Sequence, residues 1–283
     1  LRMKNKNFIR IIPKLDIKNG MLIKGINLEG LRVLGDPFNF AKYYYENHAD
    51  EICYIDNVAT LYGTNNLSSF ISQTAKNIFI PISVGGGIRN IQDIERIFKA
   101  GADKVCINSA VIDNPKFLHQ ASRIFGSANI TVVIEYVKID NKYFITKSTG
   151  RDLVNCNPLN WARKVEQYGA GEIFLTSVNH EGLNNGFDIK TINKISKSVS
   201  IPVIAHGGAG SVKHIVDLVK KTNVSGVSIS SIIHYDIAHI FKKKKFSLGN
   251  LSYLNNIKKN KKTKNFIKLI KKTLAEKGFN VRN

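Results

Sequence analysis

The segment IPISVGGG (80–87) returns in the second half of the chain as IPVIAHGG (201–208). Two more pairs recur at the same or nearly the same distance: ADEICYID (49–56) with AGEIFLTS (170–177), and VCINSA (105–110) with VSISSI (227–232). A repeat this long, with four apolar strand-like runs in each half, exceeds the unit of a solenoid protein. We therefore predict two duplicated half-barrels, which together form a single α/β fold, a (β/α)8 TIM barrel.

The length of the chain fits that architecture. Its 283 residues are somewhat more than the roughly 250 of a typical barrel, which leaves room for tails and one insertion. The strand-like runs are continuous and rich in valine and isoleucine, as in a parallel sheet buried on both faces. We divide the chain into a basic leader (1–9) and a barrel (10–283), with a Lys/Asn-rich insertion at about 241–264 before the last helix.

Helical segments are expected between the strands. Their predicted ranges are 38–48, 66–77, 91–99, 115–124, 158–168, 188–198, 211–221 and, last, about 264–277. Polar residues that favour helix N-caps precede four of them: Asn90, Asn114, Asn157 and Ser211.

Composition narrows the possible functions. The formal net charge is +21, but its clearest lysine clusters, KKKK (242–245) and KKNKKTK (258–264), lack interleaved aromatic residues. Nucleic-acid binding is therefore not expected. No apolar run is long enough to span a membrane. Cys53 and Cys106, two of three cysteines, fall in apolar strands, which indicates buried thiols and a reducing, cytoplasmic location. No metal or cofactor is predicted.

Two carboxylates end corresponding strands of the two halves. Asp16 closes the first strand and Glu135 closes the fifth, so they are expected to face each other across the barrel mouth. Catalytic residues of TIM barrels lie at that C-terminal face. Two opposed carboxyl groups suit general acid–base catalysis if their environments separate their pKa values.

Turns rich in glycine, serine and asparagine follow four strands and are also duplicated. Backbone N–H groups in such turns bind phosphate in many barrels. The repeat therefore predicts two phosphate sites on opposite sides of the mouth and a substrate with a phosphate at each end. The candidate binding residues are Gly87, Asn108 and Ser109 for one site, and Glu181, Gly182, Gly207, Gly208, Ser230 and Ser231 for the other. Thr176 is a further candidate for substrate binding.

A different set of charges precedes the strands, at the opposite face of the barrel: Arg10, Glu51, Lys104 and Glu172. Two cations and two anions there could form an ordinary surface cluster of ion pairs. They could also close a ring at the entrance to the barrel core.

From about residue 8 to 240, and again in the last helix and the terminal GFNVR, the chain resembles the cyclase subunit of imidazole glycerol phosphate synthase. The motifs that carry the resemblance occur in the family's order: RIIPKLDIKNGMLIKG (10–25), GDP (35–37), SVGGGIR (83–89), GADKVCINSA (101–110), GAGEIFLTS (169–177) and IPVIAHGGAG (201–210).

That resemblance implies a function. A glutaminase subunit docks at the barrel bottom and releases ammonia, which crosses the barrel. At the top, ammonia cleaves and cyclises a bis-phosphorylated formimino aminoimidazole carboxamide ribonucleotide, giving imidazole glycerol phosphate for histidine biosynthesis. Asp16 matches a catalytic aspartate and Lys24 matches the lysine of the flexible first loop. The four residues Arg10, Glu51, Lys104 and Glu172 match the family's ammonia gate.

Several departures concentrate on the catalytic face. Glu135 stands in place of the second catalytic aspartate, Lys14 replaces a small residue, and His206 replaces a serine. The segments 179–183 and 148–154 match the family's loops poorly. Two alternatives therefore stay open: a related ammonia-transferring paralogue that amidates a nucleotide sugar for surface polysaccharide, and a barrel that binds a partner without catalysis. The isomerase of the same pathway shares the duplication, but the gate residues disfavour it.

Overall fold

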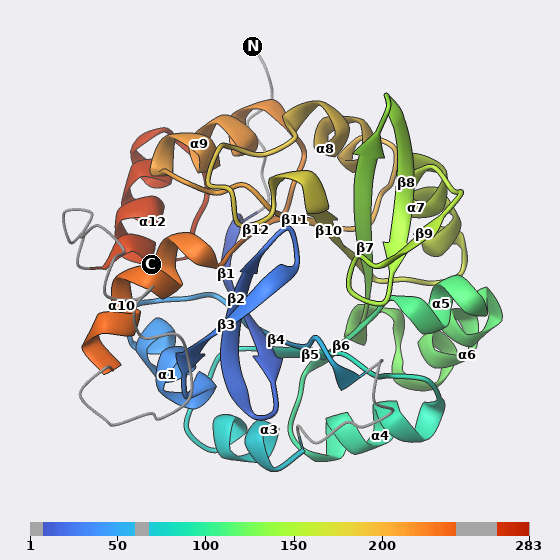
Figure 1. The fold of residues 1–283 in the computed structure, drawn as a ribbon, viewed down its shortest axis with the longest axis horizontal. Coiled ribbons are helices and arrows are strands. Elements are labelled where there is room, and N and C mark those ends of the chain that lie inside the picture. The colour runs from blue at the N-terminus through green and yellow to red at the C-terminus, as the bar shows by residue number, and fades with distance from the viewer. Residues whose placement is uncertain (1–7, 60–67, 242–264, 283) are drawn as a thin grey trace.

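A computed structural model describes residues 8–59, 68–241 and 265–282 of the chain. Eight parallel strands form a closed barrel, because β10 pairs with β7 and β12 pairs with β1. Figure 1 shows the strands inside a ring of helices. The barrel strands are β1 (Arg10–Lys18), β4 (Ile52–Asp56), β5 (Ile82–Gly85), β6 (Lys104–Ile107), β7 (Ile130–Ile139), β10 (Glu172–Ser177), β11 (Val203–His206) and β12 (Gly226–Ile229). The predicted TIM barrel is confirmed.

The outer helices in the described residues are α1 (Pro37–Glu46), α3 (Ser68–Ala75), α4 (Ile91–Lys99), α5 (Ser109–Asp113), α6 (Pro115–Phe125), α7 (Pro158–Gln167), α8 (Ile189–Ser196), α9 (Val212–Lys221), α10 (Ser231–Phe241) and α12 (Phe266–Glu276), with short 3-10 turns at Ser127–Asn129 and Val178–His180. Eight of these helices occupy the predicted segments within a few residues, whereas α5 and α10 were not predicted.

Three of the four predicted N-caps are confirmed. The side chains of Asn90, Asn157 and Ser211 each accept a backbone N–H from the first turn of their helix. Asn114 precedes α6, but its side chain makes no capping hydrogen bond. Because α5 ends at Asp113, Asn114 is the single residue that joins two helices, and its backbone N–H still bonds to Ala110.

Two β-hairpins extend the barrel beyond its mouth, and the sequence analysis missed both. β1 continues two residues past Asp16 and turns at Asn19-Gly20 into β2 (Met21–Ile26) and β3 (Glu29–Gly35). β7 continues past Glu135 and turns at Asp140-Asn141 into β8 (Lys142–Lys147) and β9 (Asp152–Val154). Both turns have positive φ at their two central residues, the geometry of tight hairpins. Asp16 and Glu135 therefore do not end their strands as predicted.

The hairpins have corresponding places in the two half-barrels, one after the first strand and one after the fifth. Figure 1 shows β2 and β3 projected over the centre of the barrel, whereas β7 and β8 rise at its edge. The backbone N–H of Asn27, in the first hairpin, bonds to the carbonyl of Glu181 at 2.9 Å. The first hairpin thus packs across the mouth and brings its own side chains to the barrel interior.

The middle of the barrel interior is apolar. One cluster of buried side chains fills it: Ile12, Cys53, Cys106, Val133, Phe174 and Ile204. Both strand cysteines are buried free thiols, as predicted. Outside the barrel, Ile270 and Leu274 of α12 join the main core, and the buried Lys271 pairs with Asp50 at 2.6 Å.

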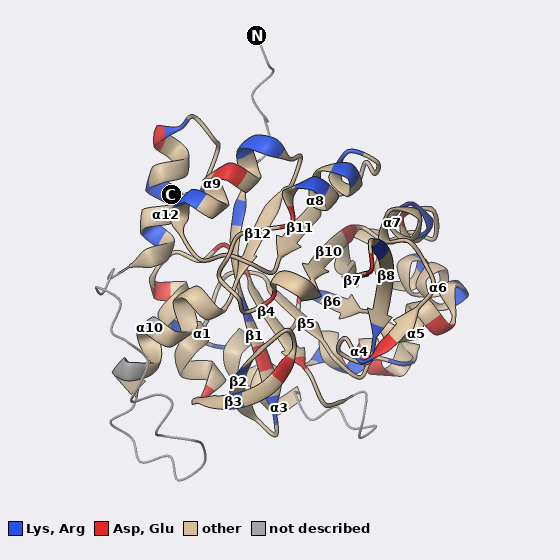
Figure 2. Ribbon diagram, turned by 45° about the horizontal axis from the view of Figure 1, so that its top comes forward, with Lys and Arg blue, Asp and Glu red and all other residues tan. Residues whose placement is uncertain are grey.

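Charged residues are spread over the outer helices, and the blue segments of the ribbon in Figure 2 mark lysine and arginine positions on α7, α8 and α9. Within the described residues, no helix is long and apolar enough to cross a membrane. The basic leader up to residue 7 and most of the predicted insertion (242–264) lie outside the described residues.

Candidate active site

Asp16 and Glu135 both lie at the C-terminal end of the barrel interior. Asp16 is buried, with 2% of its surface exposed, and Glu135 is partly buried. The Oε2 atom of Glu135 accepts hydrogen bonds from the Asn108 side-chain amide and from the Gly150 backbone, each at 3.2 Å. The structure therefore brings the two predicted acids to one region, where they interact electrostatically.

Asp16 belongs to a buried ion-pair cluster. Its carboxylate pairs with the ammonium of Lys14 and lies 3.7 Å from that of Lys24. Lys24 in turn pairs with Glu181. All four residues are at most 5% exposed. Because uncompensated charges are costly to bury, these residues depend on one another for their ionised states.

The environments of the two acids separate their pKa values. Burial opposes ionisation of Asp16, but the positive charges of Lys14 and then Lys24 hold its pKa below the usual value. Burial raises the pKa of Glu135 to about 7, against a smaller lowering by Lys14. Near neutral pH, Asp16 is therefore ionised while a large fraction of Glu135 is protonated.

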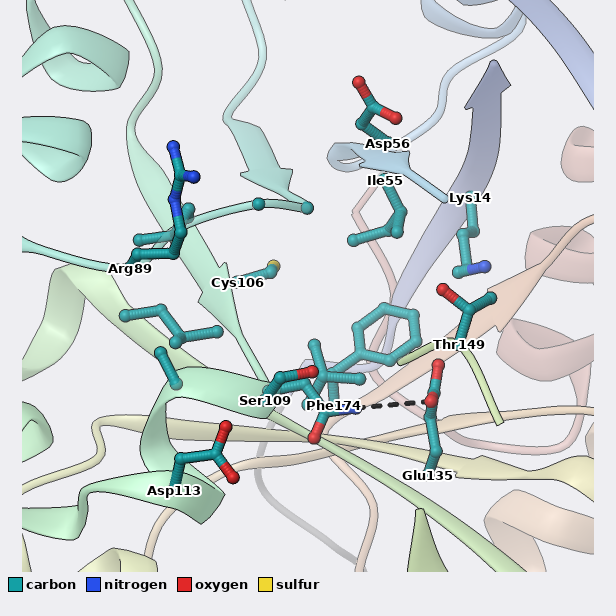
Figure 3. Close-up of a pocket in the computed structure, with 17 residues that line it drawn as sticks. Lys14, Ile55, Asp56, Arg89, Cys106, Ser109, Asp113, Glu135, Thr149 and Phe174 are labelled. Atoms are coloured by element: carbon teal, nitrogen blue, oxygen red, sulfur yellow. Dashed lines mark hydrogen bonds between the residues drawn. The ribbon is translucent and has the colours of Figure 1, made fainter. Parts of the chain in front are cut away.

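A cavity of about 260 Å³ lies beside Glu135 (Figure 3). It gathers the first set of predicted phosphate-binding residues, Gly87, Asn108 and Ser109. Figure 3 shows Lys14, Thr149 and Glu135 on one side of the cavity and Arg89 on the other. The strand-end glycines allow the close approach of the chain: a Cβ atom at Gly86, where φ is +102°, would lie 2.3 Å from the Asp56 carbonyl oxygen.

A second, much smaller cavity gathers the second set of predicted phosphate-binding residues. Its lining includes Glu181, Gly182, Gly207, Gly208, Ser230 and Ser231. Three buried polar atoms on its lining residues have no hydrogen-bond partner: His206 Nε2, Ser228 Oγ and Ser230 Oγ. Such atoms are rare in folded proteins and favour a polar ligand that would satisfy them. A Cβ atom at Gly208 would lie 2.0 Å from the Gly186 carbonyl oxygen, so this turn also depends on glycine.

Two predicted binding residues lie outside both cavities. Thr176 is buried between Glu135 and His206 in the sheet register. Lys24 lies on β2, within the first hairpin, with 1% of its surface exposed.

The sequence analysis missed Arg89 and Thr149 as lining residues of the larger cavity, and noted Lys14 only as a departure. Arg89 could have been predicted from the sequence, because it belongs to the quoted motif SVGGGIR.

At the opposite end of the barrel, the four charged residues that precede the strands form a closed ring. Glu51 accepts from Arg10 at 2.7 Å and lies 3.4 Å from Lys104, and Glu172 pairs with Lys104 at 2.9 Å and also with Arg10. Burial opposes the charge of Arg10 and Lys104, but the two glutamates raise the pKa of both cations. The ring was one of the two arrangements expected for these residues.

Residues 10–239 match the family model described as "Histidine biosynthesis protein". Three similar curated proteins are each named imidazole glycerol phosphate synthase subunit HisF. The Legionella pneumophila protein is 47% identical over 71% of this chain and 96% of its own. The Lactococcus lactis protein is 41% identical over 88% and 97%, and the Bacillus cereus (strain Q1) protein is 43% identical over 82% and 92%.

The fold and the family match together identify a (β/α)8 barrel enzyme of histidine biosynthesis. Within that class, the chain belongs to the HisF family, the cyclase-type subunits of imidazole glycerol phosphate synthase. These relatives favour the synthase over the two alternatives, the amidating paralogue and the non-catalytic barrel.

Proposed function

We propose that this chain uses ammonia to convert a bis-phosphorylated formimino aminoimidazole carboxamide ribonucleotide into imidazole glycerol phosphate and the aminoimidazole carboxamide ribonucleotide. Asp16 acts as general base and Glu135 as general acid. The observation that carries this assignment is the opposite shift of two neighbouring carboxyl groups, one held ionised and the other raised to a pKa of about 7. A general acid is most effective when its pKa lies near the working pH.

The two cavities would hold the two phosphates. Gly87, Asn108 and Ser109 would bind one, with Arg89 as an added cation, and the turns around Gly208 and Ser231 would bind the other. Ser231 is the first residue of α10, so its backbone N–H points out of a helix N-terminus, which favours an anion. The unpartnered Ser228 and Ser230 hydroxyls support a polar ligand there. Lys24, Thr176, Glu181 and Gly182 would support this side of the substrate.

Ammonia would enter through the ring of Arg10, Glu51, Lys104 and Glu172. The relatives are each named a subunit, which implies a partner chain. In our proposal this partner is a glutaminase subunit, which docks at the end of the barrel that carries the ring. Two exposed aromatic side chains suit such an interface: Phe8, 62% exposed, precedes β1, and Phe79, 75% exposed, precedes β5. Aromatic residues are enriched in protein–protein interfaces.

The direct test is turnover of the bis-phosphorylated nucleotide with ammonium salts as the nitrogen source. We expect release of imidazole glycerol phosphate by the isolated chain, and glutamine-dependent release once the glutaminase subunit is added. Absence of product with either nitrogen source, at any pH between 6 and 9, would refute the proposed reaction. Sulfate-soaked crystals supply a second test, since density should occupy both cavities; density in one alone would argue for a mono-phosphate substrate.

A further inference from the structure

Lys14 belongs to both parts of the site. Its ammonium pairs with Asp16 in the buried cluster, and its side chain lines the larger cavity together with Glu135. We propose that Lys14 is a positioning residue of the reaction, whose buried charge connects the two carboxyl groups and determines which of them carries the proton. This inference rests on the proposed acid–base roles of Asp16 and Glu135.

The position of Lys14 is fixed by its backbone. The carbonyl oxygen of Lys14 accepts a hydrogen bond from His234 Nε2 at 2.8 Å, and His234 Nδ1 lies 2.5 Å from the Tyr44 hydroxyl. Burial lowers the pKa of His234 to about 3, so this imidazole is neutral. With its proton on Nε2, it accepts from Tyr44 through Nδ1. The hydrogen bonds from Tyr44 through His234 to the Lys14 carbonyl therefore fix this part of β1 from outside the barrel.

The ionisable groups around Lys14 determine how its charge acts on Asp16 and Glu135. The ionisable groups that face it are Asp16 on its own strand, Lys24 on β2, Cys53 on β4, Glu135 on β7, Glu181 after β10, His206 on β11 and His234 on α10. Burial disfavours its charge, but Asp16 and then Glu181 raise the pKa of Lys14 above its usual value. Burial lowers the pKa of His206, so both histidines are neutral in this environment.

The charge balance explains the division between the two acids. Lys14 and Lys24 compensate Asp16 and Glu181, and no cation among the described residues forms an ion pair with Glu135. Glu135 is therefore the carboxyl group that retains its proton. Without Lys14, one negative charge would be uncompensated, and protonation of both Asp16 and Glu135 would become more favourable. The site would then lose its ionised base before it lost its acid.

The test is the pH profile of kcat/KM for Lys14→Met, measured with ammonium salts at a constant concentration of free ammonia. The wild-type profile should be bell-shaped, limited below by ionisation of Asp16 and above by deprotonation of Glu135. In Lys14→Met both limbs should move to higher pH, the upper one by on the order of one pH unit. Lys14→Arg, which keeps the charge, should leave both limbs near their wild-type positions.

Lys24→Met is the matched control. Lys24 is equally buried and also lies near Asp16, but it is not part of the cavity lining that contains Glu135. Its replacement should move the lower limb and leave the upper limb in place. If Lys14→Met lowers the rate but moves neither limb, Lys14 is merely structural and the inference is wrong.

Direct titration separates this inference from the proposed reaction. In protein labelled with carbon-13 at the glutamate carboxyl groups, the Glu135 signal, assigned by its loss in Glu135→Gln, should titrate near pH 7. It should titrate at higher pH in Lys14→Met, whether or not the wild-type chain turns over the nucleotide. Lys14→Gln provides a second neutral variant should the methionine variant fold poorly, since Lys24 still pairs with Asp16. An unchanged Glu135 titration in a folded neutral variant overturns the inference.

Discussion

At the N-terminal end of the barrel interior, two cations and two carboxylates alternate around a ring, and every member has two partners of opposite charge. At the C-terminal end, two lysines meet three carboxyl groups, and Glu135 has no cation of its own. The apolar layer around Phe174 separates the two clusters. Lysine, arginine and carboxylate side chains therefore form a fully paired ring at one end of the barrel. At the other end they form a cluster in which Glu135 is not paired with a cation.

The difference lies in charge balance. The ring contains two cations and two carboxylates, so the charges of its four members balance. The buried cluster of Lys14, Lys24, Asp16, Glu181 and Glu135 is neutral only when Glu135 is protonated, given that burial keeps His206 neutral. If the proposed roles hold, proton transfer belongs to the mouth, and the ring passes neutral ammonia without taking part in acid–base chemistry.

Loss of the base should have the largest effect. We expect Asp16→Asn to lower kcat with ammonium salts by about 10³-fold, within the range for removal of a general base. The KM for the nucleotide should change little, because Asp16 contacts lysines and not the phosphate cavities. Glu95→Gln, a carboxyl-to-amide change at an exposed position of α4, is the control. Near-wild-type kcat in Asp16→Asn would remove Asp16 from the mechanism.

Shortening the acid should have the next largest effect. In Glu135→Asp, the carboxyl group withdraws by one methylene from Asn108 Nδ2 and the Gly150 N–H. A displacement of about 1 Å can cost on the order of 100-fold in rate, so we expect a fall in kcat of that size. A rise in kcat would instead mean that the pocket still fits the family's aspartate and that Glu135 is a suboptimal replacement.

A change in the ring should lower the rate more with glutamine than with ammonium salts as the nitrogen source. Lys104→Ala leaves Glu51 and Glu172 with Arg10 as their shared cation. We expect a loss of about tenfold, roughly 1.4 kcal/mol of barrier, with glutamine and the glutaminase subunit, and a smaller loss with ammonium salts, which reach the mouth directly. Lys213→Ala, at an exposed position of α9, controls for the lost charge. Equal losses with both nitrogen sources would limit the ring to a structural role.

The repeat predicted the barrel because each duplicated motif encodes a local strand and turn. It also predicted which residues share each cavity, since turns at the ends of parallel strands meet at one face. Asn19-Gly20 and Asp140-Asn141 are two-residue turns between apolar runs, and they could have predicted the hairpins. The interpretation with four strands in each half treated these turns as parts of loops.

The buried cluster could not be predicted in the same way. Lys24 and Glu181 are 157 residues apart and meet only because the first hairpin folds over the mouth. Nothing in their spacing indicates that contact. Lys14 was visible as a departure, but its effect depends on the burial and charge of neighbours from several different elements. Residue spacing along one chain does not encode that environment.

The last expected effect is on stability and not on rate. Because Glu135 keeps its proton up to a pKa of about 7 when folded but only to about 4.5 when exposed, the folded protein binds more protons between these pH values. Its free energy of unfolding should therefore fall as pH rises from 5 to 8, relative to Glu135→Gln, by about 2 kcal/mol after allowance for solvent in the cavity. Urea unfolding of both proteins at pH 5 and pH 8 measures this difference, in which the other titrating groups cancel. Parallel pH dependence in the two proteins would show that Glu135 ionises freely, and the contrast between the proton-exchanging mouth and the inert ring would then no longer hold.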